Sequence, residues 1–430
     1  MKKILCLILA LAMMLSITAA LADPTAIDGV SDRNIKINSA GLNADPDEVI
    51  AQGYSPVTGR NLNEIEIPDG FVGSAVTGNY QPIMVQISNS SNGIGVSDDG
   101  KTIYRYAPVN ASYADVVYET VQKQEGSESR MTMVFSDLIP DYVGFVRSTR
   151  ATHPRIRQEW DCAFCTSGYA RADVPNEWKN FGVMNPELAT PDNPGLIIVG
   201  DFPKVWKDYV WRLYPQAGPN NEIFMTADII QNIIPQDHKA ANHTWLFSDE
   251  LPEGGDDASI IYVKFGNPYD TDSRLEYNPD TKLYTRYCKV QGAGDLPYRD
   301  SKLVNPVIKM VTINGEQSKR LTVKKDGRYT DADITFSNVI VQSIDMHWIA
   351  GSRPNPDLTG TGNADFFMGG KHYAGVWERK DYNDRTVFYG EDGNEISLQR
   401  GKTLIIQMPV REGWATEALK PTTNRSVSYE

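Results

Sequence analysis

A change of sequence pattern at residues 251–257 (LPEGGDD) constrains the fold of this 430-residue chain more than any other feature. Before this polar stretch, short apolar runs alternate with helical patterns, which is typical of a sheet flanked by helices. After it, strand-like runs follow one another with turn residues between them. For example, ADFFM and KHYAGVW flank Gly369-Gly370, which suits a tight hairpin. The pattern predicts an α+β chain of two domains: an N-terminal α/β domain with a central sheet, then a C-terminal β-rich domain.

The predicted boundaries follow from the same patterns. We expect a signal peptide over 1–22, an extended lead-in over 23–78, the N-terminal domain over 79–250, the C-terminal domain over 258–410 and a tail over 411–430. The lead-in is rich in Asp, Asn, Gly and Pro and has little periodicity, which is why no element is predicted in it.

Regular elements of the N-terminal domain are predicted from periodicity. Strands are expected at 82–87, 115–119, 131–135, 142–146, 162–166 and 196–199. Between 202 and 213, apolar residues recur at the spacing of one helix face, which predicts an amphipathic helix. Thr226 is a suitable N-cap for a second helix, which Pro235 would stop.

The first 22 residues have the three-part pattern of an export signal. Lys2 and Lys3 precede an apolar run over 4–19, and Ala20-Leu21-Ala22 offers a small-x-small cleavage site. We therefore expect an exported protein, extracellular or associated with the cell envelope after cleavage near Ala22. An uncleaved single-span anchor is disfavoured by the short run. No later segment reaches 18 uninterrupted apolar residues, so no transmembrane segment is expected in the mature chain.

The charge balance excludes one class of partner. The chain has 42 basic and 55 acidic side chains, and the signal peptide holds two lysines and no acid, so cleavage changes the net charge from −13 to −15. No run of Lys and Arg offsets this balance, and binding to nucleic acid phosphates needs such a patch. A nucleic-acid partner is therefore not expected.

Three cysteines remain after export: Cys162, Cys165 and Cys288. The first two form a C-x-x-C, but they lie in a strand-like run, where residues three apart point to opposite faces and do not readily pair. Zinc would need two more ligands, and the sequence has no second C-x-x-C and no H-x₃-H. Buried structural thiols are the favoured interpretation, and a redox or metal role is the alternative.

Most sequence motifs of catalysis are absent. The chain has no G-x-S-x-G, H-E-x-x-H, G-x-x-x-x-G-K-[ST] or G-x-G-x-x-G, and its five histidines form no metal-binding motif. We expect no metal and no cofactor. A pair of catalytic carboxylates leaves no linear signature, so an enzyme is not excluded.

One group of charged residues forms the candidate site. Asp115 and Glu119 share one face of a predicted strand, Arg130 opens the next strand, and a third is followed by Arg147, Ser148 and Arg150. Ser148 or Thr149 would cap a helix there. Arginines beside a helix N-terminus suit a carboxylate or phosphate ligand. The alternative is that the acids and arginines pair with one another and tie strand ends together.

Several stretches resemble the YerB-like family of bacterial cell-envelope proteins, whose function is unknown. They are SPVTGRNL at 55–62, QPIMVQISN at 81–89, YADVVYE and ESRMTMVFSD followed by VGFVRSTR, Tyr284-x-Arg286, and the long stretch from NVIVQ at 338–342 to LIIQMP. The resemblance implies an α/β domain followed by a β-rich one. The chain departs from the family in having no lipobox cysteine after the signal, and in reading AGPNNEIFMT at 217–226 where the family has R-x-x-P-H-N-L-Y.

Three functional hypotheses follow. The first is a non-enzymatic envelope protein that binds a cell-wall component or assists a wall enzyme, through the arginines. The second is a hydrolase of wall glycan or peptide with Asp115 and Glu119 as general acid and base, which requires both side chains in one open cleft. The third is a structural surface protein, which an exposed strand edge or apolar patch would indicate.

Overall fold

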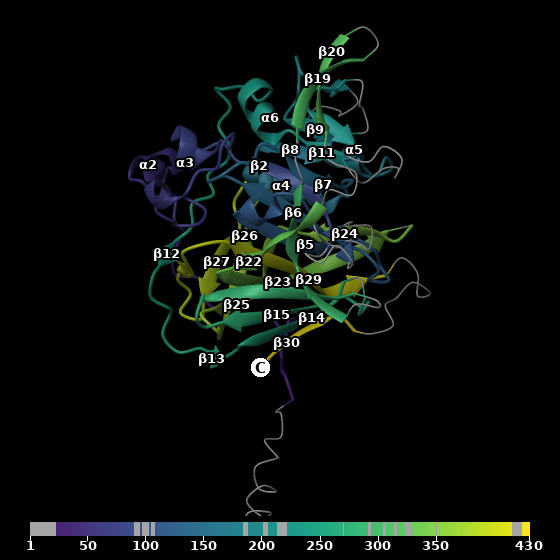
Figure 1. Cartoon of the computed structure of the whole chain (residues 1–430). Helices are drawn as coiled ribbons and strands as arrows, with labels where there is room; N and C mark the ends of the chain where they lie inside the picture. Colours follow the sequence, from purple (N-terminus) through teal and green to yellow (C-terminus); the bar gives the residue numbers. More distant parts are fainter. Residues whose placement is uncertain are drawn as a thin grey trace, which may run out of the picture.

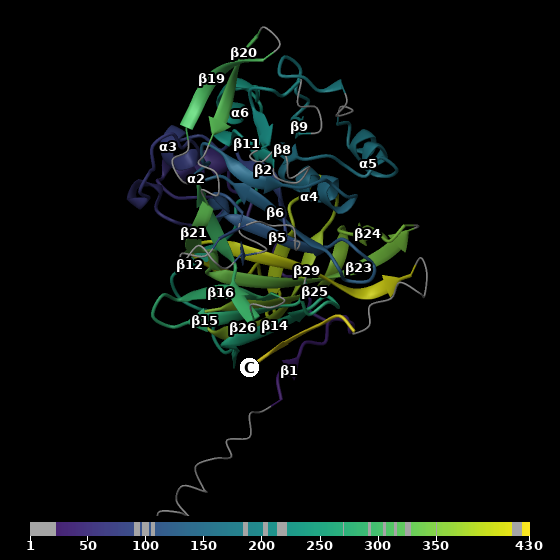
Figure 2. The same ribbon diagram turned by 45° about the vertical axis from the view of Figure 1, so that its right-hand side comes forward.

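The computed structural model describes residues 23–89, 95–96, 103–104, 108–183, 188–200, 205–212, 222–269, 271–290, 294–303, 307–313, 316–322, 328–349, 351–414 and 424–430. The predicted signal peptide lies outside these residues. Within them, no helix is both long and apolar enough to cross a membrane. The fold is mostly β-sheet, and the two sheets described below lie in layers in both views (Figures 1 and 2).

One large sheet contains strands from both halves of the chain (Figure 1). Its strands, in order, are β10 (Val210–Arg212), β11 (Glu222–Phe224), β7 (Val143–Val146), β2 (Ile83–Ser88), β6 (Ser129–Phe135), β5 (Val116–Val121), β29 (Thr403–Gly413), β23 (Asn338–Ile349), β25 (Gly360–Met368), β26 (Lys371–Arg379) and β13 (Asp256–Asp257). Four more strands belong to the same sheet but pair outside this order: β8 (Ala163–Thr166) with β2 and β9 (Ile197–Val199), β24 (Arg353–Asp357) with β23, and β27 (Val387–Gly390) with β26. The halves meet where β5 runs parallel to β29, with Val116 opposite Thr403.

A second sheet packs against the C-terminal part of the first and holds both ends of the described chain. Its order is β1 (Thr25–Ala26), β30 (Ser426–Tyr429), β14 (Ile260–Lys264), β15 (Ser273–Asn278), β16 (Leu283–Val290) and β17 (Gly294–Pro297), with β22 (Thr335–Phe336) paired to β16. Figures 1 and 2 draw β14 and β15 beneath β23 and β25. One contiguous apolar core includes residues of both sheets, from Ile50 to Tyr429.

The remaining elements are short. The helices are α2 (Pro46–Ala51), α3 (Ser74–Thr77), α4 (Thr152–Trp160), α5 (Val174–Asn180), α6 (Thr226–Asn232) and the 3₁₀ turns η1 (Leu62–Glu64) and η2 (Ala111–Tyr113). The strand pairs are β3 (Gly95–Val96) with β4 (Ile103–Tyr104), β12 (Phe247–Ser248) with β28 (Leu398–Gln399), β18 (Arg299–Leu303) with β21 (Arg328–Asp333), and β19 (Val307–Ile313) with β20 (Glu316–Thr322).

The predicted helix over 202–213 is wrong. Val210–Arg212 form strand β10, which pairs antiparallel with β11. Val210 and Trp211 are each 3% exposed. Pairing with β11 and burial therefore outweigh the helical spacing of the apolar residues in this segment. Residues 201–204 and 213 lie outside the described part of the chain.

The two segments predicted as loose ends are also more ordered than expected. The lead-in contains α2, η1 and α3, and it buries Val57 and Val72 in the core. The expected tail supplies β30, which pairs with β1 and β14 and buries Val427 and Tyr429. The polar composition of these two segments gave no sign of their ordered elements, because only a few apolar residues in each segment reach the core. The remaining domain boundaries stay predictions.

Candidate functional site

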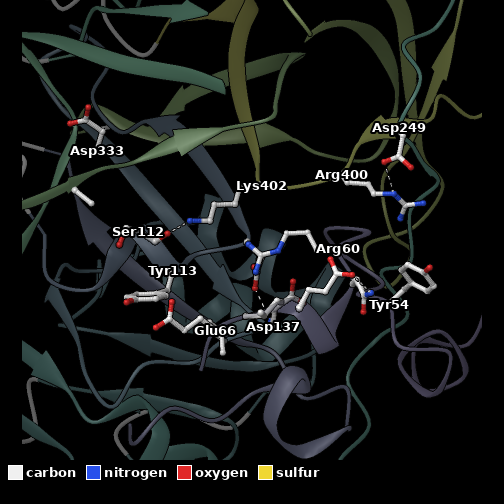
Figure 3. Close-up of a pocket in the computed structure, with 16 residues that line it drawn as sticks. Tyr54, Arg60, Glu66, Ser112, Tyr113, Asp137, Asp249, Asp333, Arg400 and Lys402 are labelled. Carbon is white, nitrogen blue, oxygen red and sulfur yellow. Dashed lines mark hydrogen bonds and ion pairs between the residues drawn. The ribbon is translucent and has the colours of Figure 1, made fainter. Parts of the chain in front are cut away.

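A pocket of about 840 Å³ opens where the lead-in meets η2 and the start of β29 (Figure 3). Its wall contains Tyr54, Arg60, Glu64, Glu66, Ser112, Tyr113, Asp115, Asp137, Asp249, Arg400 and Lys402. Charges of both signs thus line one hollow. They come from segments that are distant in the sequence and that the β5–β29 pairing brings together.

Asp115 lies in the floor of this pocket and is 1% exposed. Its backbone is fixed on two sides, since its N–H donates to Val134 (2.8 Å) and its carbonyl accepts from Thr403 (3.0 Å). The carboxylate Oδ2 accepts from the backbone N–H groups of Ser136 (2.8 Å) and Asp137 (2.9 Å). Burial, reinforced by the Asp137 carboxylate, nevertheless raises the pKa of Asp115 to about 8. The protonated form of this side chain is therefore favoured at a higher pH than in an exposed aspartate.

Asp137 is equally buried and is held by hydroxyl groups of the lead-in. Its two oxygens accept from Ser55 Oγ and Thr58 Oγ1, each at 2.6 Å. Burial raises the pKa of Asp137, and the hydroxyl bonds and the charge of Arg60 oppose that shift. Because these hydroxyls belong to the turn over 55–60, they fix the lead-in to the large sheet.

Two cations face these acids. Lys402 Nζ donates to the carbonyl of Ser112, and burial lowers the pKa of Lys402 while Asp115 opposes that shift. In Figure 3 the Arg60 guanidinium points toward Asp137. Across the part of the chain that the structure describes, neither cation forms an ion pair within 4.0 Å. Both are therefore placed to bind an anionic group of a ligand.

The rim of the pocket adds an aromatic ring and further charges. The Arg400 guanidinium lies 5.4 Å from the centre of the Tyr54 ring, and its Nε pairs with Asp249 at 2.9 Å. Exposed Glu66 lies on the side of the pocket away from Tyr54 (Figure 3). Exposed Glu64 also lines the pocket and accepts a hydrogen bond from Asn61 at 2.8 Å. Asp300 fixes η2, which contributes Ser112 and Tyr113 to the pocket, by accepting from the N–H groups of Ala111 and Ser112, both at 3.0 Å.

The structure separates the two predicted catalytic carboxylates. Asp115 lines the pocket, whereas Glu119 is fully buried between the two sheets. Glu119 pairs with Arg286 of β16 at 2.6 Å and also accepts from Asn89 (2.9 Å) and Ser129 (3.1 Å). The open cleft that an Asp115–Glu119 acid–base pair requires is therefore not formed.

The predicted arginines gather elsewhere, around Glu128. Arg130 pairs with Glu128 at 2.5 Å and also donates to the carbonyl of Ser148, while Arg147 lies 3.5 Å from the same carboxylate oxygen. Arg150 contributes to this group through its charge, which lowers the pKa of Glu128. The group lies near the N-terminus of α4, as the sequence predicted, but Ala151 is the N-cap, so the predicted cap at Ser148 or Thr149 is wrong. Thr149 instead bonds to Thr166 through its hydroxyl (2.6 Å).

Sequence reasoning missed Arg60, Asp137 and Lys402. Each lies in a stretch quoted above for its likeness to a family, but none carries a local chemical signal. Only the strand pairing that joins residues 116–120 to 403–407 reveals that they share a pocket.

The cysteines support a structural role. Cys162 directly precedes the buried strand β8 and Cys165 lies in it, which confirms the strand predicted there. All three described cysteines are free and buried. Burial raises the pKa of Cys162 to about 12 and that of Cys288 to about 11, so neither is a reactive thiolate.

Comparison with known proteins places the chain in a family. The model of the N-terminal domain of a protein of unknown function (DUF3048) matches residues 109–224, and that of the C-terminal domain of the same protein matches 261–405. This chain belongs to the YerB-like, two-domain DUF3048 family. Its fold is similar to that of the YerB protein from Bacillus subtilis, with a TM-score of 0.53 and 17% identity over 87% of this chain and 99% of that one. No curated protein matches.

The pocket uses both DUF3048 segments. Asp115 and Asp137 belong to the first matched segment, and Arg400 and Lys402 to the second, whereas Arg60 precedes both. The site therefore depends on both halves of the YerB-like chain and on its lead-in.

Proposed function

We propose that this YerB-like protein is exported and acts in the cell envelope as a non-enzymatic binding protein for a wall component. Support for export comes from the pattern of residues 1–22, with cleavage near Ala22. The N-terminal half is proposed to be an α/β unit, since β8 runs parallel to both β2 and β9 and the short helices α4 to α6 accompany them.

One observation carries the binding role: the pocket presents two cations that have no ion-pair partner within 4.0 Å among the described residues. Burial and the neighbouring Asp137 carboxyl raise the pKa of Asp115, which weakens the compensation that this acid gives to the two cations at neutral pH. A carboxylate would offset the charge of Arg60 and Lys402.

The lip of the pocket favours a ligand that carries both signs of charge. Glu64 and Glu66 suit an ammonium group, while Tyr54 offers a ring face beside Arg400. Short wall peptides combine free carboxylate and amino groups in this way. We therefore propose that the ligand is a peptide-bearing wall fragment.

Calorimetry with purified wall peptide fragments tests this function. Arg60→Gln and Lys402→Met should each weaken binding by about tenfold or more, since a charge-assisted hydrogen bond is worth roughly 1.5–3 kcal/mol. Arg411→Gln is the matched control, because Arg411 lies on the surface and pairs with Asp345 at 2.8 Å, outside the pocket. Failure of the wild-type protein to bind any fragment would refute the proposal.

A wall hydrolase is the second candidate, and the raised pKa of Asp115 favours it. A protonated carboxyl in an open pocket, beside a second carboxyl and a lysine, is the composition of a general-acid site. In this version Asp137, not Glu119, is the partner of Asp115. A hydrolase would be supported if the wild-type protein releases products from wall fragments and Asp115→Asn does not. Intact fragments after prolonged incubation would exclude it.

A further inference from the structure

A second pocket, of about 780 Å³, is distinct from the one in Figure 3, and no residue lines both. Its wall contains Ser248 and residues 250–256, residues 372–374 of β26, and residues 390–392 and 395–397 at and after the end of β27. Figure 1 draws β12 and β27, which lead into two of these segments, at the left of the molecule. We call this hollow the acidic pocket, because every residue in its wall that is charged at neutral pH is an acid.

Six carboxylates line the acidic pocket, and its wall contains neither lysine nor arginine. They belong to Glu250, Glu253, Asp256, Glu391, Asp392 and Glu395. Glu395 is compensated, since it pairs with Arg385 at 2.8 Å. Within the described part of the chain, however, the side chains of Glu250, Glu253 and Glu391 form no ion pair and no hydrogen bond. Three negative charges are thus available to a cationic ligand.

Two basic residues at the start of β26, beside this pocket, are engaged elsewhere. Lys371 pairs with Asp257 at 2.6 Å. His372 lines the pocket, but its Nε2 bonds to the carboxylate of Asp365 at 2.8 Å. These two residues therefore leave the three glutamates uncompensated.

The Tyr373 hydroxyl is a second, independent sign of a ligand. Tyr373 lines the pocket and is only 8% exposed. A Cβ added at Gly255 would lie 2.6 Å from Cε1 and 2.9 Å from Cζ of Tyr373, so the hydroxyl-bearing end of the ring lies at the wall that Gly255 forms. Among the described residues the hydroxyl has no hydrogen-bond partner, so it is free to bond to a molecule that fills the pocket.

The lining favours an organic cation over a metal ion. Across the described residues, no three His, Cys, Asp or Glu side chains form a group that could hold a metal ion. The wall also contains Leu251, Pro252 and Ile396, which suit methylene groups. Separated carboxylates, with apolar residues next to them in the sequence, match an alkyl chain that carries several ammonium groups.

We propose that the acidic pocket binds a linear polyamine, that is, an alkyl chain with two or more ammonium groups. The ammonium groups donate to the free glutamates and to the Tyr373 hydroxyl, and the methylene groups pack on the apolar residues. One exposed ion pair contributes little, so a ligand with a single ammonium group binds much more weakly. This site is separate from the pocket proposed for wall peptides, and neither proposal depends on the other.

Equilibrium dialysis with labelled spermidine at about 0.1 M salt, which screens the distant charges of this acidic protein, tests the inference. The wild type should bind one equivalent saturably. Glu253→Gln and Glu391→Gln should each weaken binding by about two- to fivefold, the usual effect of one exposed ion pair, and the double variant by about tenfold. Both glutamates are exposed, so these substitutions should leave the fold intact. Tyr373→Phe should weaken binding by about two- to tenfold, because it removes one hydrogen bond.

Three controls make the test specific. Glu48→Gln removes an exposed charge of α2 outside both pockets and should bind like the wild type. Arg60→Gln and Glu66→Gln change the other pocket and should also bind spermidine like the wild type. Magnesium chloride should displace spermidine no more than sodium chloride does at equal ionic strength.

No saturable binding by the wild type, or unchanged affinity in the double variant, would overturn the proposal. Equal weakening in Glu48→Gln and Glu253→Gln would also overturn it, because net charge alone would then explain the binding. Displacement by magnesium far beyond that by sodium would assign the pocket to a metal ion instead. The result for wall peptides does not bear on any of these outcomes.

Discussion

The buried ion pair between Glu119 and Arg286 joins the two sheets and allows a sharp test of what holds them together. Replacing Arg286 with Met keeps most of the side-chain volume but leaves the Glu119 carboxylate without its 2.6 Å partner. Neither residue is exposed at all, so water cannot replace the lost guanidinium. The perturbation is therefore electrostatic rather than steric.

The expected cost is about 3–5 kcal/mol, the usual range for removing one partner of a buried pair. Asn89 and Ser129 still donate to Glu119, and they moderate the loss without neutralising the charge. Glu119→Gln should cost a similar amount, because it leaves Arg286 uncompensated beside the Tyr298 ring at 5.5 Å. The double variant contains no buried charge at this place and should be destabilised by only about 1–3 kcal/mol.

Urea denaturation of the wild type, both single variants and the double variant measures these values as one thermodynamic cycle. The cycle should give an interaction energy of about 6 kcal/mol, with similar slopes in all four curves. Arg411→Met removes an exposed ion pair and should change stability by less than about 1 kcal/mol. If the double variant loses the sum of the two single losses, the pair does not act as a unit and the reasoning is wrong.

Three other predictions concern stability and reactivity. Burial raises the pKa of Asp115 to about 8, above its value near 4 in the unfolded chain, so stability should fall as the pH rises from about 4 to about 8. In Asp115→Asn, urea midpoints measured at pH 5, 7 and 9 should fall less steeply with pH than in the wild type. The same dependence on pH in both proteins would contradict the raised pKa of Asp115. Deleting residues 424–430 removes β30 and the burial of Val427 and Tyr429, and should lower stability by about 3–6 kcal/mol in the same assay, whereas a true tail would cost nothing. In protein prepared without residues 1–22, a thiol reagent at pH 8 should react slowly with the folded state and should label three thiols after unfolding. Rapid labelling of the folded protein would show that a thiol is exposed.

Local pattern predicted much of the strand content but not the partners of the strands. The hairpin at Gly369-Gly370 is present as β25 and β26, with Met368 opposite Lys371, because glycines at a tight turn leave little choice of register. The run at 210–212 shows the opposite case. Its apolar residues fit a helix face and a buried strand equally well, and only the presence of β11 decides between them.

The candidate site was only partly predictable for the same reason. Asp115 could be singled out as an acid at a strand end, but its neighbours Asp137 and Lys402 follow from the order of strands in the sheet, which periodicity does not encode. Glu119 was assigned to the same site because residues four apart share a face of a strand. Its partner Arg286 lies in the other sheet, and no spacing rule along one strand could have predicted it.

The parallel pairing of β5 with β29 also determines the order of events when the chain is made. Ribosomes deliver the N-terminus first, so β5 emerges long before the strand that will cover its edge. Until residues 403–407 arrive, β5 presents unpaired backbone groups and an apolar surface, a template for association with other chains. Completion of the large sheet is therefore a late, long-range event, and newly made chains should depend on a holding chaperone until their last tenth has been synthesised.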